Sequence, residues 1–112
     1  MNEKRIFNKL VRDKIPEIIE NNGDIPEIEI LDDSTYSKML DEKLLEECNE
    51  ILSASNNKEK TEEIADALEV LYAMAEVIGV TMSDIETIRL DKQEKRGAFK
   101  KKILLKSTTP KN

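Results

Sequence analysis

Two pairs of acidic residues in the middle of the sequence have the spacing of neighbours on a helix. They are Glu47 and Glu50, followed by Glu63 and Asp66. Side chains three positions apart lie on one face of a helix, so each pair presents two carboxylates in one direction. Carboxylate oxygens are the ligands that Mg²⁺ and Mn²⁺ prefer. If the two pairs meet, they would therefore form a site for a divalent cation.

The elements that carry these pairs are predicted to be two helices joined by a turn. Apolar periodicity predicts one helix over 35–53 and a second over 58–78, which Gly79 would end. The residues between the two helices include Ser-Asn-Asn, which is typical of a turn. Helices joined by so short a connection pack antiparallel. The end of the first would then lie beside the start of the second, and the four carboxylates would converge.

These carboxylates have a second interpretation, because 38% of the residues are charged and glutamates on helices commonly face water. Glu63 and Asp66 precede Val70 by seven and four positions, which places them in line with the apolar stripe of their helix. An unpaired charge on that side is costly. Three other glutamates of this helix share a different face, as expected for solvent-exposed residues: Glu62, Glu69 and Glu76. The pattern alone leaves both interpretations open.

The composition limits the chemistry that this chain can perform. It contains no histidine, which excludes imidazole bases, Ser-His and Cys-His nucleophile pairs and HExxH zinc sites. A net charge of −6 makes nucleic acid an unlikely partner. The single cysteine, Cys48, lies on an apolar stripe and is expected in the core, and one cysteine is compatible with a reducing compartment. With no signal-peptide or membrane-spanning pattern, we expect a cytoplasmic protein without a membrane partner.

Two further helices are expected on either side of the central pair. A short one follows Pro16 and continues over 17–22, where Asn-Asn-Gly is a stop signal. A third long helix is expected over 82–96, started by Thr81-Met82-Ser83-Asp84 and stopped by Gly97. The fold class is therefore mainly α.

A small strand pair and one domain complete the expected organisation. Residues 25–31 alternate between apolar and acidic side chains, which predicts a strand, and 103–105 could pair with it. The length of 112 residues indicates one domain, assigned to 1–106. The polar residues 107–112 are expected to form a frayed tail.

The helix over 61–79 is apolar around most of its circumference. Such a helix needs cover on all sides, which one partner helix cannot provide. We therefore expect a helical bundle completed by oligomerisation, as a homodimer or a homotetramer.

Two basic groups contrast with the acidic total. They are Lys9, Arg12 and Lys14 near the start, and Lys92, Lys95, Arg96, Lys100, Lys101 and Lys102 near the end. Many surface Lys and Arg side chains only balance charge. Beside a metal-carboxylate site, however, they could bind a polyphosphate, and Lys92 and Arg96 share one helix face.

Three blocks of the sequence, taken in order, resemble the MazG-like all-α nucleoside triphosphate pyrophosphohydrolases, in particular the phosphoribosyl-ATP pyrophosphohydrolase-like subgroup. The first is Asn-Lys-Leu-Val-Arg-Asp-Lys-Ile-Pro over 8–16, and the second is the ExxE and ExxD pair described above. The third covers 89–99 and contains Lys-Arg-Gly-Ala-Phe. One departure is Cys48-Asn49 between the first two glutamates, where the family more often has a hydrophobic residue and a third acid.

The resemblance implies a Mg²⁺-dependent enzyme that cleaves a nucleotide between the α- and β-phosphates, releasing a monophosphate and pyrophosphate. Its metal ligands would be Glu47, Glu50, Glu63 and Asp66, with Mn²⁺ as a second candidate ion. Glu46 or Glu50 would orient the attacking water, and phosphates would be held by Lys92 and Arg96, together with Arg12 and Lys14. The alternative is a non-catalytic, oligomerising binding or regulatory module that kept the fold.

Overall fold

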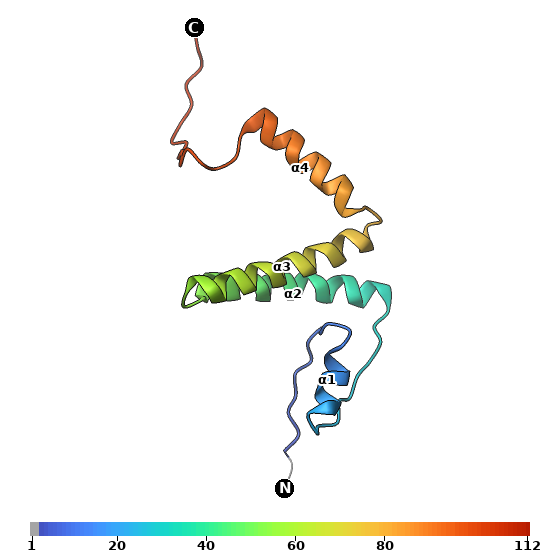
Figure 1. The fold of residues 1–112 in the computed structure, drawn as a ribbon. Helices are drawn as coiled ribbons and strands as arrows, with labels where there is room; N and C mark the ends of the chain where they lie inside the picture. The colour runs from blue at the N-terminus through green and yellow to red at the C-terminus, as the bar shows by residue number, and fades with distance from the viewer. Residues whose placement is uncertain (1–2) are drawn as a thin grey trace. The chain divides into compact units, whose positions relative to one another are not determined.

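The computed structural model describes residues 3–112, and four helices lie in this part of the chain (Figure 1). They are α1 (Ile15–Asn21), α2 (Asp33–Ser53), α3 (Asn57–Val77) and α4 (Met82–Arg96). The predicted mainly α fold class is confirmed. The helix over 82–96 has its expected bounds, whereas α2 begins two residues and α3 one residue before the predicted start.

No β-strand is present among residues 3–112, so the segments 25–31 and 103–105 are irregular. A strand is defined by hydrogen bonds to a neighbouring strand, and neither segment has such a neighbour here. Neither predicted strand is therefore seen among residues 3–112. The two segments also belong to different units, Met1–Gly79 and Val80–Asn112, into which the chain divides. Their pairing stays a prediction, as does the single domain over 1–106.

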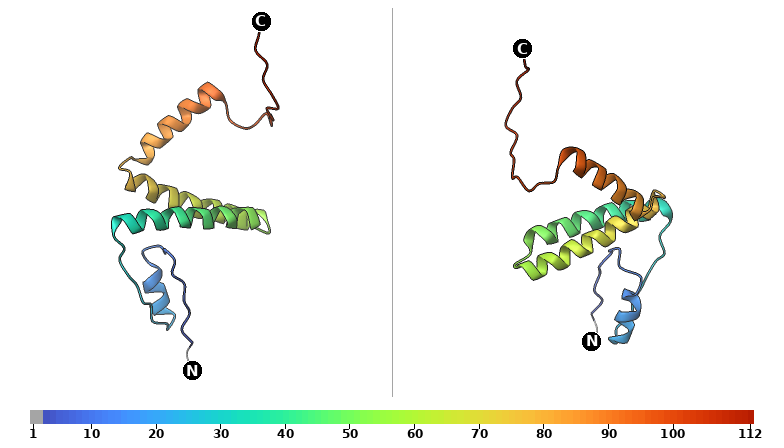
Figure 2. Two further views of the ribbon diagram at one scale, coloured as in Figure 1. Left: turned by 180° about the vertical axis from the view of Figure 1, so that it is seen from behind. Right: turned by 45° about the horizontal axis from the view of Figure 1, so that its top comes forward.

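The helices α2 and α3 form an antiparallel hairpin that is the centre of the first unit (Figure 2). Each begins at a side-chain cap of the expected type. The carboxylate of Asp32 accepts a hydrogen bond from the Thr35 amide at 2.7 Å, and the side chain of Asn56 accepts one from the Glu59 amide at 2.9 Å. Only residues 54–56 separate the two helices. The short turn therefore brings the end of α2 beside the start of α3, as the sequence predicted.

The interface between the two helices is built from one large and several small side chains. Leu40 of α2 is 4% exposed, and Ala67, Val70 and Ala75 of α3 are also buried. Small side chains at these positions allow two helices to pack closely. Cys48 was predicted in the core, but it is exposed because it lies on the side of α2 that turns away from α3.

Several large apolar side chains of the hairpin are exposed in the single chain. Their most exposed members are Leu45, Leu52 and Ile78, and Ile64, Leu68, Leu71 and Tyr72 are also exposed. Within the first unit, α2 is the helix that packs against α3. The oligomer was predicted because one partner helix does not cover all the apolar side chains of α3.

The second unit consists of α4 and the irregular residues 97–112. A capping box starts α4: the Thr81 hydroxyl accepts a hydrogen bond from the Asp84 amide, and the Asp84 carboxylate accepts one from the Thr81 amide. Gly97 ends the helix with φ of 84°, a conformation that favours glycine. The predicted tail, 107–112, is exposed and has no regular secondary structure.

Within the described residues, the structure contains no helix that is both long and apolar enough to cross a membrane.

Candidate metal centre

Three of the four predicted ligands come together in the half of the hairpin nearer the turn. One carboxylate oxygen from each of Glu47, Glu63 and Asp66 lies within 4.8 Å of the other two. Glu47 comes from the last turns of α2, and Glu63 and Asp66 come from neighbouring turns of α3. The convergence results from the antiparallel packing, because the turn separates Glu47 on α2 from Glu63 and Asp66 on α3.

Glu47 is the most informative of the three, because it is only 7% exposed. A glutamate in that position requires a partner for its charge. Among the described residues, the basic side chain nearest to Glu47 is that of Lys43. The distance from Lys43 Nζ to Glu47 Oε1 is 3.7 Å, which is longer than a hydrogen bond. The buried carboxylate is therefore only partly neutralised by the protein itself.

The donor set fits a hard divalent cation. Mg²⁺ binds oxygen at about 2.0–2.1 Å, so oxygens on opposite sides of one ion lie about 4.2 Å apart. The three oxygens are within 4.8 Å of one another, so small side-chain rotations would bring them to one ion. All three donors are carboxylates, and no nitrogen or sulfur ligand accompanies them in this group. This chemistry matches Mg²⁺ or Mn²⁺.

Glu50, the fourth predicted ligand, is not part of this group. Its side chain is exposed, whereas that of Glu47 is buried. It nevertheless lies close enough to affect the group electrostatically, since its charge contributes to the raised pKa of Glu63. Glu50 is thus placed beside the three carboxylates rather than among them.

The group has an excess of negative charge, and Glu63 shows this most clearly. Partial desolvation raises the pKa of Glu63 above its usual 4.5, and the neighbouring charges of Asp66, Glu50 and Glu47 raise it further. A bound cation would remove this repulsion.

Glu46 lies outside the group and is already paired with two lysines. Its carboxylate accepts a hydrogen bond from Lys9 Nζ at 2.8 Å, and Lys43 Nζ lies 3.4 Å from its other oxygen. These contacts, that of Lys9 first, lower the pKa of Glu46 against the opposing effect of burial. Lys43 was not singled out in the sequence, although its spacing of three and four residues from Glu46 and Glu47 could have indicated the contact.

The predicted phosphate-binding residues have different surroundings. Arg12 Nη2 lies 2.7 Å from Asp66 Oδ1, so this guanidinium forms an ion pair with one of the three converging carboxylates. Lys14 is exposed and precedes the first residue of α1. Lys92 and Arg96 are exposed on α4, in the second unit, and their role stays a prediction.

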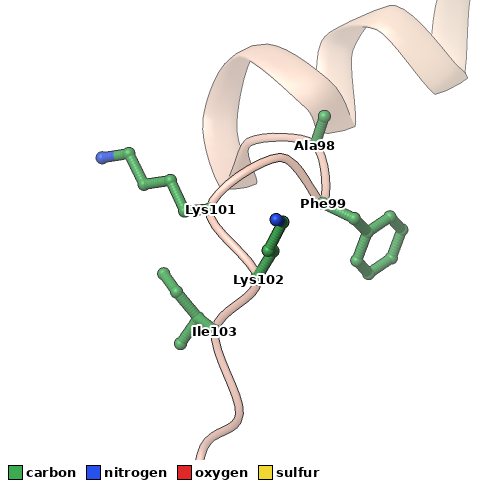
Figure 3. A pocket seen from close by; sticks show the side chains of 5 residues that line it. All are labelled: Ala98, Phe99, Lys101, Lys102 and Ile103. Atoms are coloured by element: carbon green, nitrogen blue, oxygen red, sulfur yellow. The ribbon is translucent and has the colours of Figure 1, made fainter.

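Two hollows in the described part of the chain are lined by residues other than the three carboxylates. A small one of about 60 Å³ lies beside Glu46 and is lined by Asn8, Lys9, Leu10, Met39, Glu42 and Lys43. A larger one of about 270 Å³ belongs to the second unit and is lined by Ala98, Phe99, Lys101, Lys102 and Ile103. Figure 3 shows the side chains of Phe99 and Lys101 pointing in opposite directions. This hollow therefore brings no set of functional groups together.

Comparisons with known proteins do not assign the chain to a family. No protein-family model matches it, and neither a curated protein nor a solved structure gives a significant match. The MazG-like resemblance thus stays a prediction from the three sequence blocks.

The raised pKa of Glu63 predicts an unusual dependence of stability on pH. The folded protein holds this proton more tightly than the unfolded chain, so the contribution favours folding below the usual pKa of 4.5 and is lost as pH rises through the raised value. In metal-free protein, Glu63→Gln should therefore increase the free energy of unfolding at about pH 7 and change it little at about pH 4. Urea unfolding with a chelator measures both. A variant that is less stable at neutral pH would show that Glu63 is held by a cationic partner instead.

Proposed function

We propose that this protein is a Mg²⁺-dependent nucleotide pyrophosphohydrolase, which cleaves a nucleoside triphosphate or a related nucleotide between the α- and β-phosphates. The observation that carries the proposal is the convergence of Glu47, Glu63 and Asp66 oxygens within 4.8 Å, with Glu47 buried. The order of the three motif blocks supports the substrate class and the bond that is cleaved.

The residues that would hold the ion are Glu47, Glu63 and Asp66, with Glu50 within reach as a fourth ligand. When bound, such an ion lowers the pKa of a coordinated water and stabilises negative charge on phosphoryl oxygens. Because the sequence contains no histidine, a carboxylate would accept the proton of the attacking water. Glu46 is paired with two lysines, whereas Glu50 has no ion pair among residues 3–112. Glu50 is therefore better placed than Glu46 to accept a hydrogen bond from the attacking water.

The substrate would be held by cations on either side of the hydrolysed bond. Arg12 is already at the carboxylate group, and its fork of N–H donors suits phosphate oxygens. Lys14, Lys92 and Arg96 are the other proposed phosphate ligands. Each contact would neutralise charge on the pyrophosphate as it leaves.

The enzymatic proposal is tested with a panel of standard and modified ribo- and deoxyribonucleoside triphosphates in the presence of Mg²⁺. Release of pyrophosphate together with a monophosphate is the expected result, and a chelator should abolish it. If no member of the panel yields pyrophosphate, the protein is not this enzyme.

A non-catalytic binding module is the second candidate, and the pairing of acidic residues with Lys9, Arg12 and Lys43 favours it, since these acids already have structural partners. The two candidates differ in their response to Mg²⁺ alone. An enzyme with this site should gain thermal stability when Mg²⁺ is added, whereas the module should show no shift.

For either function we propose a cytoplasmic homodimer or homotetramer in which a second α2–α3 hairpin covers the exposed apolar residues. The support is the exposure of Leu45, Leu52 and Leu68 in the single chain. Light scattering coupled to gel filtration gives the mass directly, and a single-chain mass of 12.8 kDa would refute the oligomer.

A further inference from the structure

A segment at the start of the chain is bound across the hairpin by two ion pairs. We define it as the N-terminal strap, residues 8–14. Lys9 Nζ lies 2.8 Å from Glu46 Oε1 on α2, and Arg12 Nη2 lies 2.7 Å from Asp66 Oδ1 on α3. The strap begins with Asn8 in a left-handed conformation, φ of 47°, and ends where α1 starts. Figure 1 shows this part of the chain turning beside α2.

The two ion pairs differ in what they occupy. Glu46 lies outside the group of three carboxylates, so the contact of Lys9 leaves that group untouched. Asp66 belongs to the group, so the guanidinium of Arg12 already supplies positive charge to the same carboxylate that a divalent cation would use. A guanidinium and a divalent ion at one carboxylate repel each other and compete for its oxygens.

The Arg12–Asp66 pair is weak enough to be exchanged. The two side chains are 56% and 44% exposed, and ion pairs in such surroundings add little net stability. A divalent ion instead gains three carboxylates at once, one of them on the buried Glu47. The ion should therefore displace Arg12, while Lys9 keeps the strap attached to α2.

We propose that the N-terminal strap responds to the divalent cation. When Glu47, Glu63 and Asp66 hold no ion, Arg12 neutralises part of their charge. When the ion binds, Arg12 is released toward the solvent side of the site. There the guanidinium is available to an anionic substrate, so the metal is bound before the substrate can be held. This inference rests on the metal site of the proposed function and adds its regulation by residues of the same chain.

Calorimetric titration with Mn²⁺ alone tests the competition. Removing the competing cation in Arg12→Gln should lower the Kd for Mn²⁺ by about two- to five-fold, the range expected for loss of an exposed ion pair. The matched control is Lys14→Gln, which removes the same charge from the same strap at a residue with no ion pair among those described. Its Kd should stay near that of the unaltered protein. Arg12→Lys, which keeps the charge, should lie between the two.

Trypsin gives a second readout that does not depend on affinity. Cleavage after Arg12, followed by mass spectrometry, should be faster in the unaltered protein with saturating Mn²⁺ than with a chelator, because the released side chain can enter the protease. Cleavage after residues of the second unit, such as Lys101, serves as the internal reference for trypsin activity.

The possible failures are distinguishable. If the unaltered protein binds no Mn²⁺, the metal site and the proposed function fail together with the strap. If it binds Mn²⁺ but Arg12→Gln behaves like Lys14→Gln, or if Mn²⁺ slows cleavage after Arg12, only the strap proposal is wrong. Circular dichroism spectra of the variants establish that each is folded before titration.

Discussion

Replacement of Glu63 by glutamine should lower the rate of pyrophosphate release by about 100-fold or more. Loss of an outer partner of a metal ligand typically costs about 10- to 100-fold in metal affinity or activity, and Glu63 is itself one of three converging carboxylates. The amide preserves the size of the side chain but provides no negative charge. Initial rates at several Mg²⁺ concentrations measure the effect, and the loss should be smaller at high Mg²⁺ if it arises from weakened metal binding.

The control for this variant is Glu62→Gln, one residue earlier on α3. Glu62 is exposed and is not part of the carboxylate group, so its variant should keep nearly full activity. Equal activities in the two variants would remove Glu63 from the metal site. Glu63→Gln is also predicted to be more stable than the unaltered protein at neutral pH without metal. A variant that is more stable and yet inactive has not lost its activity through misfolding.

Replacement of Leu40 by alanine should cost about 2–5 kcal/mol of the free energy of unfolding. Leu40 is 4% exposed and is the one large apolar side chain among the buried core residues of the hairpin that the structure describes. Alanine would leave a cavity between α2 and α3 that the surrounding small residues cannot fill. Because domains are typically stable by only about 5–15 kcal/mol, this is a large fraction of the total. Urea unfolding followed by circular dichroism measures it.

Leu45→Ala on the same helix provides the comparison, since Leu45 is 68% exposed in the single chain. If only the hairpin buries apolar residues, this variant should change stability by no more than about 0.5 kcal/mol. If Leu45 is instead covered by a second copy, the cost should be larger at high protein concentration and shrink as the protein is diluted, because dilution separates the copies and exposes Leu45 in both proteins. A cost below about 1 kcal/mol for Leu40→Ala would contradict the packing described here.

Local features of the helices were accessible from the sequence because they depend on neighbouring residues. The apolar periodicity and the short turn predicted α2, α3 and their antiparallel packing. The start signal over 81–84 and the stop at Gly97 act within one helical turn, so residue type indicated them. The approach of Glu47 to Glu63 and Asp66 was also predicted, since it follows from spacing once the hairpin is assumed.

The contacts between distant residues were decided by the tertiary structure. The rotation of α2 about its axis places Glu47 inside and leaves Glu50 and Cys48 exposed, and a period of 3.6 residues does not determine that rotation to within one residue. No strand is present among residues 3–112 either, and a strand depends on a hydrogen-bonded neighbour that the local sequence does not supply.

Arg12 is the clearest case of what only the tertiary structure decided. It pairs with Asp66, 54 positions away, and nothing in its local sequence distinguishes it from Lys14 as the residue that does so. The sequence by itself determined which residue types are present for metal and phosphate chemistry and on which helices they lie. Which of them meet was set by the packing of α2 on α3 and by the return of the strap across both, because contacts at such separations depend on the path of the whole chain between them.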